Sequence, residues 1–111
     1  MCIRDRSWWA ADPRERQLSD RIQAFFESQG LKTYGSQFTL DGKLLVDEHT
    51  TALVATNAVA SLAATNPRAA KFVEALWSAE IPSGPYRYYD GMWYVMGLLH
   101  CSGQFRIWAP R

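Results

Sequence analysis

Residues 51–65 read TALVATNAVASLAAT, and this stretch decides the fold class. It places Leu53, Val54 and Leu62 among many alanines and carries no charged side chain. A helix without a polar face is normally buried on most sides, and small side chains let neighbouring helices approach closely. The stretch therefore predicts a helix over about residues 51–64 inside an all-α protein.

A second helix is predicted upstream of this stretch. Asp12 has the features of an N-cap, Pro13 suits the first helical position and Gly30 supplies the stop. Four apolar residues recur at helical spacing between these signals, and charged residues cover the opposite face. The predicted apolar face consists of Leu18, Ile22, Phe25 and Phe26.

Two more helices are predicted downstream. Asn66 reads as the cap and Pro67 as the first residue of an amphipathic helix that ends near Ser78. Asp90 reads as the cap of a last helix over residues 91–102, which again carries no charge. Amphipathic and uncharged helices therefore alternate along the chain.

This alternation predicts two layers, with the amphipathic helices outside and the uncharged ones inside. A partial (α/α)6 barrel, or toroid, of about four helices is built in this way. Since four helices complete only part of such a ring, the uncharged helices should have exposed apolar flanks. Residues 31–50 interrupt the pattern, and the turn signal Asp41-Gly42 predicts a short hairpin-like loop there.

Composition excludes several classes of function. The chain has 111 residues, enough for one domain, and a formal net charge of +1, which gives no basic excess for phosphates. Its two Cys and two His lack zinc-ligand spacing. We therefore expect neither nucleic acid nor membrane as a partner, and no metal or other cofactor.

The first six residues, MCIRDR, differ in character from the remainder of the chain. They show no helix or strand period, and no apolar run comes after them as it would in a signal peptide. The string resembles a translated sequencing-adapter scar. We expect residues 1–6 to be a non-native leader and residues 7–111 to be the domain.

Residues 86–94, YRYYDGMWY, are the strongest local signal. Aromatic rings stack on the C–H faces of sugars, and phenols reach their hydroxyls. Tyr88 and Tyr89, placed before a helix start, are candidate sugar contacts, although the same rings could seal the core. Gly91 would allow a close backbone approach.

Other polar residues have weaker functional signals. His49 could bind a sugar hydroxyl or lie on the surface, and Asn57 within the apolar helix needs a buried partner such as a loop carbonyl. Glycoside cleavage requires two facing carboxyl groups, separated by roughly 5 Å or 6.5–9.5 Å. The acidic residues are explained as caps, a turn or solvated faces, except Asp47 and Glu48, which are neighbours in a loop and point to opposite sides, so no catalytic pair is assigned.

Several segments in order resemble glycoside hydrolase family 8 across nearly all of residues 8–108. They are residues 40–43 (LDGK) with His49, 55–64 (ATNAVASLAA), 72–77 (FVEALW), 88–94 (YYDGMWY), 98–103 (LLHCSG) and 105–107 (FRI). The resemblance implies an (α/α)6 barrel that hydrolyses β-1,4-linked glycans with inversion, using a Glu acid, an Asp base and no metal. It makes residues 7–111 the C-terminal part of such a catalytic domain, and a secreted or periplasmic location follows from it.

The resemblance also assigns residues. The family's acid lies far upstream and its base shortly before the segment matching residues 7–9, so we expect this chain to lack both and to be inactive. Tyr89 and Tyr88 match cleft-lining aromatics, and His49 matches a position that contacts the leaving-group sugar in xylo-oligosaccharide-releasing members. The loop continues Thr50-Thr51-Ala52 instead of the Leu-His-Pro of exo-acting members.

Xylan or xylo-oligosaccharide is the favoured substrate, followed by β-glucan or cellulose. One alternative is a small helical interaction domain without a catalytic role, whose aromatic residues all lie in the core. A freestanding sugar-binding module fits less well, since such modules are usually rich in β-strands.

Overall fold

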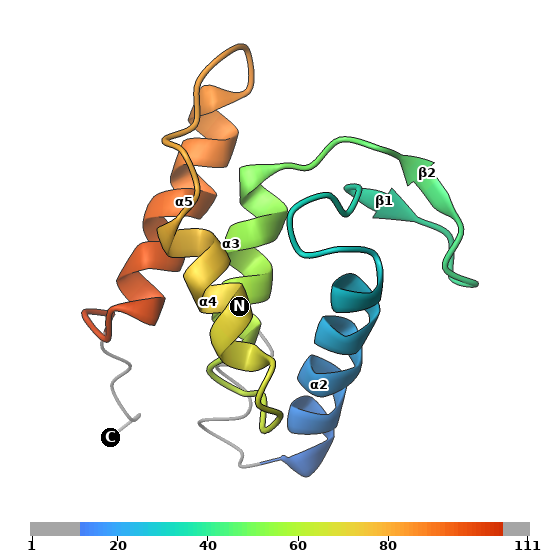
Figure 1. Ribbon diagram of the computed structural model, residues 1–111. Helices are drawn as coiled ribbons and strands as arrows, with labels where there is room; N and C mark the ends of the chain where they lie inside the picture. The colour runs from blue at the N-terminus through green and yellow to red at the C-terminus, as the bar shows by residue number, and fades with distance from the viewer. Residues whose placement is uncertain (1–11, 106–111) are drawn as a thin grey trace.

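The computed structural model describes residues 12–105, which form a mostly helical structure with one two-stranded sheet (Figure 1). The elements in chain order are α2 (Pro13–Ser28), β1 (Gln37–Phe38), β2 (Leu44–Val46), α3 (Thr51–Ala60), α4 (Ala69–Trp77) and α5 (Arg87–Cys101). The predicted four helices and the hairpin are confirmed. The leader, residues 7–11 and the tail residues Ile107 and Trp108 lie outside the described part.

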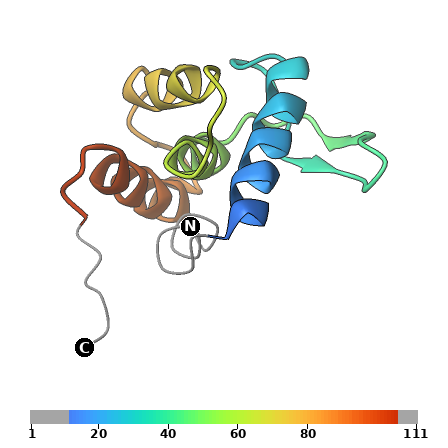
Figure 2. The same ribbon diagram turned by 90° about the horizontal axis from the view of Figure 1, so that it is seen from below.

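Helix α3 occupies the centre. It packs most extensively against α5, then against α4 and α2, and Figure 2 shows it between α5 and α2 with α4 over it. Its residues Ala55, Ala58 and Val59 are fully buried. Phe72 and Leu76 of α4 complete the core together with Tyr34. The predicted burial of the uncharged central helix is confirmed.

Helices α3 and α5 approach each other closely at Gly97. A Cβ atom there would lie 3.0 Å from the Cβ of Ala55 and 3.1 Å from Cδ2 of Leu76. A Cβ at Gly91 would meet nothing within 4 Å among the described residues. The prediction that Gly91 allows the close approach is therefore wrong, and Gly97 has that role.

Helix α2 begins as predicted but turns a different face inward. Asp12 accepts a hydrogen bond from the Arg14 backbone N–H at 2.9 Å, and Pro13 is the first helical residue. The buried residues are the polar Glu15, Ser19 and Gln23. Among the four residues of the predicted apolar face, Phe26 packs against the core whereas Leu18 remains 44% exposed.

Hydrogen bonds explain this polar face. Gln23 Nε2 donates to the Asn57 carbonyl at 3.2 Å and to Ser61 Oγ at 2.7 Å. Asp20 accepts from the backbone and side chains of Thr65 and Asn66, so it is not the solvated residue that the sequence predicted. These bonds account for Gln23 Nε2 and for Asp20, whereas Ser19 Oγ and Gln23 Oε1 are buried without a partner among the described residues. The orientation of α2 that forms these bonds leaves Leu18 exposed.

Three helix ends differ from the prediction. Asn66 donates its side-chain amide to Asp20 instead of capping, and α4 begins at Ala69. Helix α5 begins three residues before Asp90, so Tyr88, Tyr89 and Asp90 lie in its first turn. Helix α3 ends at Ala60.

One side of α5, its bare side, is not covered by any other element of residues 12–105. Tyr88, Met92, Val95 and Leu99 share this side at helical spacing, and their exposed fractions run from 38% to 80%. The predicted exposed flank is confirmed for α5, whereas α3 has an exposed large apolar residue only beyond its end, at Leu62. Within residues 12–105 no helix is long and apolar enough to cross a bilayer.

Candidate functional site

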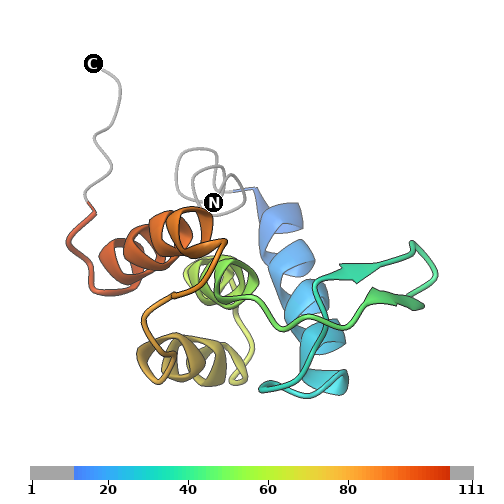
Figure 3. The same ribbon diagram turned by 90° about the horizontal axis from the view of Figure 1, so that it is seen from above.

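A groove of about 370 Å³ lies where α3 and α5 begin. The two N-terminal ends lie at the same end of the molecule, beside the segment that joins β2 to α3 (Figure 3). The lining residues are Ser36, Gln37, Glu48, Thr50, Ala52, Leu53, Thr56, Tyr86, Tyr89, Asp90 and Trp93. The hairpin, α3 and α5 thus each contribute one wall.

Tyr89 and Trp93 form the aromatic part of this groove. They lie one helical turn apart on α5, with ring centroids 6.2 Å apart and an interplanar angle of 68°. Tyr89 is 60% exposed, so its ring does not seal the core. An exposed ring beside a half-buried one can offer an apolar face and a phenol hydroxyl to a sugar.

Tyr88 lies elsewhere. It is 80% exposed, belongs to the bare side of α5 and does not line the groove. Successive helical residues point about 100° apart, which separates it from Tyr89. The two tyrosines that the sequence paired are therefore not brought together, and the alternative that all aromatic residues lie in the core is wrong.

The groove also has polar walls. Thr50 caps α3 by accepting from the Leu53 N–H at 3.4 Å, and Thr56 Oγ1 donates to the Leu53 carbonyl at 3.0 Å. Glu48 and Asp90 make no ion pair with a described residue. Their carboxylates are available to sugar hydroxyls. The sequence missed both, because Glu48 was interpreted as a loop residue that points away from its neighbour Asp47, and Asp90 as a cap.

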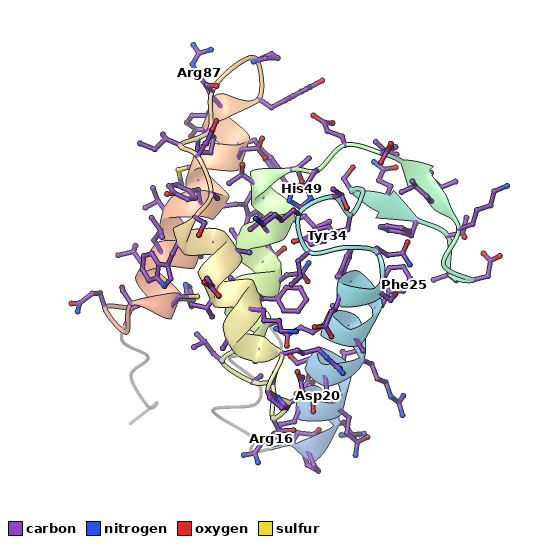
Figure 4. All side chains as sticks on the ribbon, viewed as in Figure 1. Arg16, Asp20, Phe25, Tyr34, His49 and Arg87 are labelled. Carbon is purple, nitrogen blue, oxygen red and sulfur yellow. The ribbon has the colours of Figure 1, made fainter. Side chains whose placement is uncertain are left out.

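His49 lies in a different groove. This second groove, of about 830 Å³, is formed by α4, the start of α3 and the turn after α2, and it includes Leu31 and Glu74. His49 Nδ1 lies 2.9 Å from the Tyr34 carbonyl, and the two rings meet edge to face at 4.5 Å (Figure 4). Because a carbonyl only accepts, Nδ1 carries the proton and Nε2 remains available. The structure does not bring His49 together with Tyr89.

The remaining polar candidates are structural. Asn57 is 3% exposed, its own carbonyl accepts a hydrogen bond from Gln23, and its side chain lies against the Tyr34 phenol, whose pKa it lowers while burial raises it more. The prediction that its side chain holds a loop carbonyl is wrong. His100 is buried. Its Nδ1 lies 2.7 Å from the Met96 carbonyl oxygen, and its ring stacks on Phe105 with the ring centroids 4.1 Å apart.

Burial raises the pKa of the Tyr34 phenol, whose ring lies between Phe26 and His49.

Within the described residues no three His, Cys, Asp or Glu side chains gather as metal ligands would. The functional features are thus an aromatic pair and two carboxylates at one end of a helical assembly. That combination defines a wall suited to carbohydrate.

Comparison with known proteins agrees with this class. No family model matches the chain. It is 39% identical over 106 residues to the reducing-end xylose-releasing exo-oligoxylanase Rex8A of Paenibacillus barcinonensis, covering 94% of the chain and 28% of the relative. It is 33% identical over 109 residues to the corresponding exo-oligoxylanase of Halalkalibacterium halodurans, covering 96% and 28%.

Solved structures give the same result. A crystal structure of a GH8 protein from Teredinibacter turnerae in complex with xylobiose superposes with a TM-score of 0.87 at 46% identity, covering 96% of this chain and 27% of that one. Rex8A bound to xylose superposes with a TM-score of 0.84 at 37% identity, covering 97% and 29%. These matches support the chain as a part of a glycoside hydrolase family 8 protein. The chain spans just over a quarter of the length of these relatives.

Proposed function

We propose that residues 7–111 are the C-terminal part of the catalytic domain of a family 8 enzyme that hydrolyses β-1,4-linked xylan or xylo-oligosaccharides with inversion. The similarity to exo-oligoxylanases and to a xylobiose complex favours xylose-based substrates over β-glucan. In the whole protein, water would attack the anomeric carbon opposite a protonated leaving oxygen.

The arrangement of the helices supports a partial (α/α)6 toroid. The central α3 is covered by α2, α4 and α5, while α5 exposes an apolar side that includes Met92 and Val95. Apolar side chains aligned along one helix are stabilised when another helix packs on them. A further helix of the ring would bury this side of α5.

The observation that carries the proposal is the exposed Tyr89 beside Trp93 in the groove. These rings would stack on xylose units, and Gln37, Glu48 and Asp90 would hydrogen-bond their hydroxyls. His49 Nε2, held by the Tyr34 carbonyl through Nδ1, would contact sugar only where a chain also reaches the second groove.

Titration of xylohexaose into the 15N-labelled chain tests the binding part. We expect shifts of the Trp93 indole and of the Tyr89 amide, and a loss of affinity of about 1 kcal/mol or more in Tyr89→Ala, since a stacked ring is removed. Tyr88→Ala is the matched control, because Tyr88 is as large, adjacent and outside the groove. Equal losses in both variants would contradict the proposed groove.

The chemistry is tested separately. We expect no release of reducing sugar from xylan or xylohexaose by this chain, because the resemblance to family 8 implies that the family's acid and base lie before the segment that matches this chain. Turnover above a heat-denatured blank would contradict that expectation. It would direct attention to Glu48 and Asp90, the two carboxylates in the groove.

A further inference from the structure

We propose that Glu48 and Asp90 make the aromatic groove selective for uncharged xylo-oligosaccharides over those that carry a uronic acid substituent. The proposal rests on the proposed function and deepens it by naming the substrate class. Both carboxylates line the groove, and none of its described lining residues is Lys, Arg or His.

No described cation lines the groove or forms an ion pair with Glu48 or Asp90. Arg87 is next to the groove in sequence, but its Nη1 donates to the Gly84 carbonyl at 3.1 Å and the residue is not part of the lining. In Figure 4 its side chain lies at the tip of the α4–α5 loop. Lys32 and Lys71 line the second groove, which contains His49, and not the aromatic groove.

The N-termini of α3 and α5 add partial positive charge to the groove, which opposes the negative charge of Glu48 and Asp90. Each helix start contributes roughly half a positive charge, which declines within the first turn. The start of α3 is capped by Thr50, and Asp90 itself lies in the first turn of α5. Two full negative charges against about two halves leave the groove with a net charge of about −1.

A net charge of this size produces a measurable selectivity. A carboxylate on the ligand at about 6 Å from a unit negative charge is disfavoured about threefold in bulk water, and about tenfold or more at a lower effective dielectric constant. A neutral substituent of the same size meets only steric limits. The negative charge of the groove can therefore discriminate between xylans with acidic and with neutral substituents, without a new contact to the xylose units.

The experiment compares three ligands by NMR titration of the 111-residue chain. They are linear xylotetraose, a xylotetraose that carries 4-O-methylglucuronic acid, and the methyl ester of that same acid. We expect the acid to bind about threefold to tenfold more weakly than its ester. Added NaCl should narrow this difference, which a steric effect would not do.

Variants identify the responsible groups. Glu48→Gln and Asp90→Asn should each reduce the difference between acid and ester, and the double variant should abolish it. Asp47→Asn is the matched control, since Asp47 precedes Glu48 but does not line the groove. An acid that binds as tightly as its ester, or a difference that persists in the double variant, would overturn the selectivity while leaving the proposed function in place. Failure of xylotetraose itself to bind would overturn both.

Discussion

Helices α3 and α5 are both largely apolar, but they have different surroundings. Each has many apolar residues and almost no charge. Ala55, Ala58 and Val59 of α3 are fully buried, whereas Met92 and Val95 of α5 are 54% and 53% exposed. An apolar composition therefore indicates that a helix can be covered, but its neighbours decide whether it is covered.

Those neighbours differ in a simple way. Helix α3 contacts α2, α4 and α5, while α5 contacts mainly α3 and α4 within the described residues. The side of α5 opposite to Gly97 consequently faces no other element of residues 12–105. Within residues 12–105, α5 therefore lies at the edge of the helical arrangement and α3 lies in its middle. The proposed partial toroid requires such an edge helix.

The largest effect is expected in the core around α3. Phe72 is 1% exposed and belongs to the core cluster with Val54 and Ala58. Phe72→Ala should lower the free energy of unfolding by about 3–5 kcal/mol, because it removes the ring and leaves a cavity. Urea denaturation followed by far-UV circular dichroism measures this loss. Phe72→Leu, which keeps most of the volume, should lose much less.

The next effect concerns the contact between the two helices. Gly97→Val places side-chain atoms where Ala55 and Leu76 already lie, so we expect a loss of about 1–3 kcal/mol. Gly91→Ala on the same helix meets nothing within 4 Å and should gain about 0.5–1 kcal/mol through helix propensity. If both glycine variants changed stability alike, the close approach at Gly97 would be wrong.

Local signals were sufficient for much of the fold. The Asp12 cap, the Gly30 stop and the turn at residues 41–42 each depend on one or two residues, and all three are observed. The buried polar face of α2 could not be predicted in this way. It depends on hydrogen bonds that Gln23 donates and Asp20 accepts, with partners more than thirty positions away along the chain, which a helical period does not reveal.

The candidate site, like the fold, could be predicted only where the signal is local. The aromatic stretch pointed to Tyr89, but its separation from Tyr88 depends on where α5 begins, and that start is set by the Gly84–Arg87 turn instead of by a capping side chain. Glu48 joins the groove because the segment after β2 returns toward α5, a tertiary placement with no local signal.

A smaller effect is expected at Asp20, which ties α2 to the turn between α3 and α4. The hydrogen bond from the Thr65 side chain is the main cause that lowers the pKa of Asp20 from 3.8 to about 2. Ionised Asp20 therefore stabilises the fold above about pH 4, and this contribution is lost as the pH falls through 2. Since the group is partly exposed, we expect Asp20→Asn to cost only about 1 kcal/mol at pH 7.

The measurement for Asp20 is a pair of urea titrations at pH 7 and at pH 2.5. The difference between the original chain and Asp20→Asn should shrink at pH 2.5, because Asp20 is then already protonated in the unfolded chain while it is still mostly ionised in the folded one, and this removes most of the stabilisation that its lowered pKa provides. A difference that stays constant would show that the Asn amide disturbs the turn sterically. Glu74→Gln, on an exposed part of α4, is a control for general charge effects.

The smallest effect is expected on the bare side of α5, and it tests the comparison most directly. Val95→Ser should change the free energy of unfolding by less than about 0.5 kcal/mol, since Val95 is 53% exposed and loses little buried area. The matched change Val54→Ser in α3, where Val54 is 5% exposed, should cost several times more. If Val95→Ser were as costly as Val54→Ser in the same urea titration, α5 would be covered in solution and could not be an open edge of the ring.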